Sequence, residues 1–177
     1  MNSNAKKYLI AYYSRRGENY FNGSITDLKV GNTEVVAGMI QNITGGDLFH
    51  IETVKAYPKG YTETTNVAKD ELRADARPEL TGRVTNMDDY DVIFLGYPNW
   101  WGTMPMPVFT FLESYDFSWK TIIPFCTHEG SGLGRSEQDI RKACSKAKVL
   151  SGVAIRGGSS ASSQSLVSEW IDKLNIS

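Results

Sequence analysis

Short apolar runs alternate along the whole chain with segments that favour helices. Runs typical of strands lie at residues 8–13, 47–52, 91–96, 121–126 and 148–155. Segments with helical periodicity or helix-favouring composition lie between and after them, at 33–44, 61–76, 108–115, 136–143 and 166–174. Five strands separated by helices predict a parallel sheet with right-handed crossovers and helices on both faces.

Several positions refine these predicted elements. Gly45 is expected to end the first helix, and Pro124 removes one donor from the fourth strand. Gly152 is expected to kink the fifth strand. Ser136 and Asp139 have the spacing of a capping box, which predicts a helix that begins at Ser136.

Length and composition fit one ordinary globular domain spanning residues 1–177. The chain has 177 residues, of which 41% are hydrophobic and 22% charged. Its net charge of -1 argues against nucleic-acid binding, which needs a basic face. No apolar segment is long enough for a membrane span or a secretory signal, so we expect a cytoplasmic protein with no membrane partner. No cysteine or histidine spacing indicates a metal site.

The segments after the first, third and fourth strands carry the candidate chemistry, because open parallel sheets bind ligands beyond the carboxyl ends of their strands. Ser14 and Arg15 follow the first strand, and Asn32 and Thr33 open the first helix after Gly31. Hydroxyls and free amides at a helix N-terminus favour a phosphate. An ordinary helix cap at Asn32 or Thr33 explains the same residues equally well.

After the third strand, an aromatic loop contains Pro98, Asn99, Trp100, Trp101 and Gly102. Neighbouring side chains diverge, so two adjacent indoles cannot both enter one core, and at least one is expected to face solvent or a flat ligand. An aromatic lid over the following helix is the alternative that we favour less.

The loop after the fourth strand is rich in glycine and polar groups. It contains Thr127, His128, Glu129, Gly130, Ser131 and Gly132. These residues suit the polar edge of a ring better than a dinucleotide, because the glycine spacing is wrong for the dinucleotide fingerprint. Cys126 with His128 also suggests a thiol nucleophile of a hydrolase, but Cys126 lies inside the predicted strand, and a buried structural cysteine is the better interpretation.

Together these three loops resemble those of flavodoxin-like FMN proteins of the short type. Ser14-Arg15 with Gly31-Asn32-Thr33 resembles their phosphate loop, and segments 96–102 and 127–132 resemble their two flavin-binding loops. The resemblance implies an α/β three-layer sandwich with five parallel strands in the order 2-1-3-4-5. It also implies an FMN phosphate held by Ser14, Arg15, Asn32 and Thr33, and a flavin ring between the other two loops.

The resemblance implies electron transfer through FMN, with a redox protein or a small-molecule electron acceptor as partner. A flavodoxin-type shuttle is the leading hypothesis, because Trp100 and Trp101 would take the room that a nicotinamide needs in an NAD(P)H-dependent reductase. A cofactor-free binding module is a further alternative. The chain departs from the usual pattern in two ways: its net charge is small, and residues 16–30 are inserted in the phosphate loop. We expect this insertion to be a surface flap rather than a lid over the ribityl chain, because loop insertions cost little stability.

Overall fold

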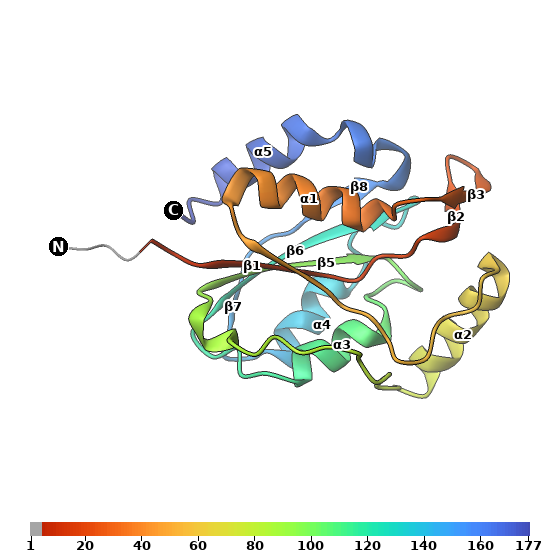
Figure 1. Ribbon diagram of the computed structural model, residues 1–177, viewed down its shortest axis with the longest axis horizontal. Coiled ribbons are helices and arrows are strands. Elements are labelled where there is room, and N and C mark those ends of the chain that lie inside the picture. Colours follow the sequence, from red (N-terminus) through yellow and green to blue (C-terminus); the bar gives the residue numbers. More distant parts are fainter. Residues whose placement is uncertain (1–4) are drawn as a thin grey trace.

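The structure is a computed structural model that describes residues 5–177, and a parallel β-sheet forms its centre (Figure 1). The strands run in the order β4-β1-β5-β6, and both β7 and β8 pair with the far side of β6. Their bounds are β1 (Tyr8–Tyr12), β4 (Asp47–His50), β5 (Val92–Pro98), β6 (Thr121–His128), β7 (Lys148–Val149) and β8 (Val153–Arg156). With β7 and β8 as two halves of one fifth strand, the expected order is confirmed.

Pro124 explains why the fifth strand is divided. On β6, Ile122 pairs with Val149 of β7 and Phe125 pairs with Val153 of β8. The two residues of β6 between these pairs therefore lie opposite the three residues that join β7 to β8. Pro124 has no N–H to donate at this point. A Cβ on Gly152 would lie 2.6 Å from the Pro124 carbonyl oxygen, so glycine allows the close approach. The expected kink at Gly152 is confirmed.

Helices cover both faces of the sheet. One face is covered by α1 (Asn32–Thr44) and α5 (Gln164–Lys173), and the other by α3 (Met106–Glu113) and α4 (Ser136–Ala143) (Figure 1). Two 3-10 turns, η1 (Met87–Asp89) and η2 (Gly157–Ser162), complete the connections. Ile93 on one face and Phe94 on the other are both fully buried, because side chains alternate along a strand that is covered on both sides. None of the helices in the described part of the chain is long and apolar enough to cross a membrane.

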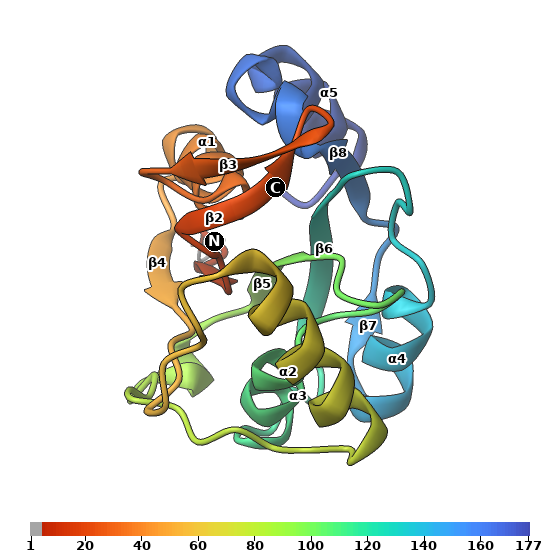
Figure 2. The same ribbon diagram turned by 90° about the vertical axis from the view of Figure 1, so that its right-hand side faces the viewer.

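The inserted residues form an antiparallel hairpin of β2 (Gly17–Phe21) and β3 (Ser24–Leu28). Its turn places Asn22 at φ 51° and Gly23 at φ 88°, the left-handed conformations that a type I′ turn needs at both positions. Figure 2 shows this hairpin and helix α2 (Tyr61–Arg73) at the carboxyl end of the strands, with α2 in front. These two elements therefore frame the edge where the candidate loops meet.

The helix predicted to begin at Ser136 is confirmed as α4, but its capping box and the end of another predicted helix were wrong. Ser136 does not cap α4, because its buried hydroxyl donates to the Leu133 carbonyl and accepts from the Tyr97 hydroxyl. Its expected partner Asp139 accepts a hydrogen bond from Thr103 at 2.5 Å. The helix predicted for 61–76 ends at Arg73, because Asp75 adopts a left-handed conformation with φ 48°. The helix therefore ends earlier than the position of Pro78 predicted.

Candidate functional site

A cavity of about 470 Å³ opens at the carboxyl edge of the sheet. It is lined by the segments after β1, β5 and β6, by the hairpin and by α2. The lining residues are Ser14, Arg15, Asn19, Tyr20, Asn32, Thr33, Tyr61, Thr64, Thr65, Ala68, Pro98, Asn99, Trp100, Trp101, Gly102, Thr127, His128, Glu129 and Ser131. Of the site residues predicted from the sequence, Gly130 and Gly132 alone are not among them. That these residues bind a cofactor stays a prediction.

The N-terminus of α1 forms one end of the cavity. Gly31 precedes the helix, and no side chain caps the helix in the usual way. The Ser14 hydroxyl accepts the Glu34 N–H at 3.1 Å. Within residues 5–177, the N–H groups of Asn32 and Thr33 have no hydrogen-bond partner. Two open N–H groups at the positive end of a helix dipole favour an anion.

Gly31 allows this arrangement because the end of β1 runs close beside it. A Cβ at this position would overlap the Ser14 hydroxyl and lie 2.6 Å from the Arg15 carbonyl oxygen. Gly31 also stands at the cap position of α1, and Asn32 and Thr33 are the first two residues of the helix. The alternative of an ordinary cap at Asn32 or Thr33 is therefore wrong.

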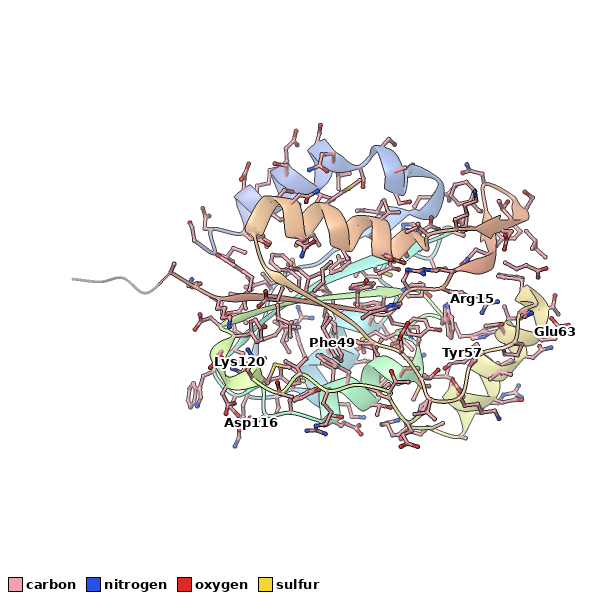
Figure 3. The ribbon with its side chains drawn as sticks, viewed as in Figure 1. Arg15, Phe49, Tyr57, Glu63, Asp116 and Lys120 are labelled. Atoms are coloured by element: carbon pink, nitrogen blue, oxygen red, sulfur yellow. The ribbon has the colours of Figure 1, made fainter. Side chains whose placement is uncertain are left out.

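Arg15 lines the cavity, but its guanidinium has other partners. It donates to the carbonyl oxygens of Glu18 at 3.1 Å, Pro58 at 3.0 Å and Lys59 at 2.9 Å. Figure 3 shows Arg15 at the same end of the molecule as α2, opposite the end that holds Lys120 and Asp116. Arg15 joins the hairpin to the start of α2, and it could bind a phosphate only by exchanging some of these bonds.

The aromatic loop after β5 is a tight turn from Trp100 to Thr103. The Trp100 N–H donates to the Thr103 carbonyl at 2.9 Å, and Trp101 and Gly102 adopt φ 57° and 87°. A bulky residue with positive φ is a backbone outlier that costs on the order of 1–2 kcal/mol. The Trp101 indole N–H donates to the Thr65 carbonyl on α2 at 2.9 Å, which holds the ring in place.

The two indoles diverge as the sequence predicted. Trp101 remains 48% exposed, and the Lys69 ammonium lies 5.1 Å from its ring centre. Trp100 instead packs edge-on against Tyr13 and Tyr57, each with ring centres 5.2 Å apart. Both indoles line the cavity: Trp100 is held in place by two tyrosine rings, and Trp101 is half-exposed.

Asn99 joins the two loops that flank the cavity. Its side-chain amide donates to the Gly132 carbonyl at 2.8 Å and its carbonyl accepts the Gly102 N–H at 2.9 Å. The backbone N–H of Asn99 donates to the Thr127 carbonyl oxygen at 2.8 Å. These bonds fix the distance between the loop after β5 and the loop after β6.

The loop after β6 folds around His128. The His128 Nδ1 accepts the Gly130 N–H at 2.9 Å, so the proton of the neutral ring lies on Nε2. Burial, and secondly the Arg156 guanidinium, lower the pKa of His128. Gly130 and Gly132 adopt φ 146° and 60°. Their role is to shape the loop, which explains why they do not line the cavity.

Cys126 is buried within β6, as expected for a structural cysteine. Burial raises the pKa of its thiol to about 12, so the thiol stays protonated near neutral pH. It also does not line the cavity. The structure therefore does not support the thiol nucleophile that Cys126 and His128 suggested.

Six lining residues were not predicted from the sequence. Asn19 and Tyr20 come from the hairpin, so the insertion lines the cavity rather than lying apart from it as a surface flap. Tyr61, Thr64, Thr65 and Ala68 come from α2. Their spacing at i, i+3, i+4 and i+7 places them on one helical face, and this was the signal available in the sequence.

Comparison with known proteins decides the family. The flavodoxin family model matches residues 7–174. The chain belongs to the flavodoxin family. No curated protein sequence matches it significantly.

Solved structures similar to this flavodoxin-family chain include three bacterial proteins. A provisionally assigned flavoprotein from Bacteroides eggerthii has 24% identity and a TM-score of 0.79, with 98% of this chain and 100% of that chain covered. Another from Bacteroides uniformis has 26% identity and a TM-score of 0.75, with 94% and 98% covered. A flavoprotein from Lactobacillus acidophilus in complex with FMN has 22% identity and a TM-score of 0.67, with 91% and 99% covered. These likenesses confirm the α/β fold with its mostly parallel sheet.

Proposed function

We propose that this chain binds FMN in the cavity at the carboxyl edge of the sheet and acts as an electron carrier. The observation that carries the proposal is the pair of open N–H groups on Asn32 and Thr33, at one end of a cavity that also contains two indoles. An anion and a flat aromatic ring in one molecule match these two features together.

The residues present fit FMN in size and in chemistry. A cavity of about 470 Å³ lies within the range of roughly 300–1,000 Å³ that is common for small-molecule sites. The α1 N-terminus suits a phosphate, the hydroxyls of Tyr61, Thr64 and Thr65 suit a polyol chain, and Trp100 and Trp101 suit a flat ring. When bound, FMN would supply the redox chemistry, because a flavin takes up and releases one or two electrons.

The protein's own residues would orient the cofactor and exclude water from it. Asn99 fixes the spacing of the two loops around the ring site. His128 is kept neutral, and its Nε2–H can donate to a polar ring edge. The hairpin residues Asn19 and Tyr20 cover the cavity on the side of the phosphate loop.

The electron-carrier role rests on the aromatic loop. Trp101 is held against α2 through Thr65, so its indole would take part of the room beside the flavin that a nicotinamide needs. A redox protein that approaches the exposed rim then suits the site better than a nicotinamide stacked inside it. Reduction of a quinone or another small acceptor with NAD(P)H is the alternative role.

Two measurements on the purified protein test the proposal. A yellow protein whose released cofactor co-elutes with FMN is the expected result, and turnover of NAD(P)H with a quinone should be slow without a protein partner. A colourless protein that gains no thermal stability from added FMN would contradict cofactor binding. Rapid NAD(P)H turnover by the isolated protein would replace the carrier role with the reductase role.

A further inference from the structure

The β2–β3 hairpin is attached to the rest of the molecule at both ends. At its base, the Glu18 carboxylate accepts the backbone N–H of Tyr61, the first residue of α2, at 2.7 Å. The ring of Tyr20 also lies 6.2 Å from the ring of Tyr61. The hairpin and the start of α2, which both line the cavity, are therefore bonded to each other. Figure 2 shows the two elements as neighbours.

The hairpin tip rests on η2. A Cβ on Gly158 in η2 would overlap the side chain of Asn22, so the tip lies directly on the Gly158 backbone. The Asn22 backbone N–H faces the Glu129 carboxyl closely enough to stabilise its charged form. The hairpin thus extends from α2, past the N-terminus of α1, to the loop after β6.

Glu129 occupies an unusual position beneath this tip. Among the described residues, its Oε1 is buried and has no hydrogen-bond partner. A Cβ on Gly157 would lie 2.5 Å from both this oxygen and the Asn32 side-chain nitrogen, so the carboxyl lies beside the start of α1. A buried carboxyl oxygen without a partner lowers the free energy of unfolding. This oxygen lies beside the α1 N-terminus, which we call the anion end of the cavity.

We propose that Glu129 is a positioning residue that latches the hairpin tip over the anion end of the cavity and thereby slows the release of FMN. This inference rests on the proposed function only for the identity of the retained ligand. The latch itself is a property of the cofactor-free chain, since Asn22 lies on Gly158 and the Glu129 carboxyl lies beside Gly157 and the Asn22 N–H.

The latch should respond to pH. The charged and titratable groups that act on Glu129 or feel its charge are Arg156 on β8 and Tyr61 on α2, and His128 precedes Glu129 in the chain. Burial raises the pKa of Glu129, and Arg156 and the Asn22 N–H only partly offset this effect. Opening exposes the carboxyl to water and restores its usual pKa, so the closed state binds the proton more tightly. Closure is therefore favoured at acidic pH and weakens as pH rises through the raised pKa.

The variants separate charge from contact. Glu129→Gln keeps the acceptor and the shape but cannot ionise, whereas Glu129→Ala removes the contact. Gly158→Ala should displace the hairpin tip without altering Glu129, because the new methyl group meets the Asn22 side chain. The double variant Asn22→Gly, Gly158→Ala removes that side chain, and glycine keeps the left-handed conformation at position 22. Glu169→Gln, at an exposed carboxylate on α5, is the matched control for loss of one charge.

Two readouts are measured for each variant. Hydrogen exchange of the hairpin amides in the cofactor-free chain should be about tenfold faster in Glu129→Ala and Gly158→Ala, and restored in the double variant. The FMN dissociation rate, followed by flavin fluorescence between pH 5 and 8, should rise with pH in the unmodified protein. In Glu129→Gln, release should stay slow and the part of this rise that Glu129 causes should be absent.

The outcomes that overturn the latch differ from those that overturn FMN binding. Unchanged hairpin exchange in both Glu129→Ala and Gly158→Ala, or an unaltered pH profile in Glu129→Gln, would contradict the latch. If the chain binds no FMN, the proposed function fails, and the exchange of the cofactor-free hairpin still decides whether the latch exists.

Discussion

The side-chain hydroxyls of Thr33 and Thr127 lie 2.7 Å apart, although 94 residues separate them in the sequence. Thr33 belongs to the first turn of α1, and Thr127 to the end of β6. This buried bond joins the anion end of the cavity to the loop that carries His128. A change at either threonine is therefore expected to affect both parts of the site.

The first prediction concerns this pair. Thr33→Val should lower the free energy of unfolding by about 1–3 kcal/mol, because it leaves the Thr127 hydroxyl buried without its partner. Changing both threonines to valine should cost less than the sum of the two single changes. A double-mutant cycle from urea unfolding of the cofactor-free protein measures this coupling, and simple additivity would argue against it.

The second prediction concerns Gly31. Gly31→Ala should push the start of α1 away from Ser14 and Arg15, so FMN affinity should fall at least tenfold while riboflavin affinity changes little. Gly38→Ala in the same helix is the control, because a Cβ there meets nothing within 4 Å. It should stabilise the protein by about 0.5–1 kcal/mol and leave FMN affinity unchanged. Equal FMN affinity in the two variants would place the phosphate elsewhere.

The third prediction separates the backbone of Trp101 from its indole. Trp101→Gly should be more stable to unfolding than Trp101→Ala by about 1 kcal/mol, because only glycine adopts φ 57° without strain. Both variants should bind FMN more weakly by about 1 kcal/mol if the indole stacks on the flavin. Thermal unfolding and FMN titration measure the two effects. Unchanged affinity in both variants would remove Trp101 from the ring site.

The fourth prediction concerns pH. Since the folded chain lowers the pKa of His128, the unfolded chain binds this proton more tightly. His128 therefore does not destabilise the fold above the pKa of roughly 6.5 that it has in the unfolded chain. As pH falls below that value toward the lower pKa of His128 in the folded chain, the free energy of unfolding decreases. His128→Asn keeps an acceptor for the Gly130 N–H and should lose less stability between pH 7.5 and 5.5. An NMR titration that gives His128 an ordinary pKa would contradict this account.

The sheet and the three loops were predictable because local sequence determines them. Ile93 and Phe94 lie in a continuous apolar run, which is typical of a strand covered on both faces, and the loops follow such runs directly. The divergence of Trp100 and Trp101 likewise follows from their being adjacent residues. The exact left-handed turn at Trp101 was not predictable, because α2 stabilises it through Thr65.

The remaining features depend on contacts between distant segments. Arg15 was assigned to the phosphate site, but Pro58 and Lys59 provide carbonyl partners that no local pattern reveals. Ser136 has the spacing of a cap, yet Tyr97 from another strand binds its hydroxyl. The place of the hairpin over the cavity depends on Asn22 meeting Gly158, at a sequence separation that motif analysis does not cover.

Calorimetric titration of the cofactor-free protein with FMN, and separately with riboflavin, tests the central claim most directly. The site predicts one FMN per chain, with riboflavin bound at least tenfold more weakly because it lacks the group that Asn32 and Thr33 would hold. Absence of FMN binding, or equal affinity for the two ligands, would contradict a site built on the α1 N-terminus.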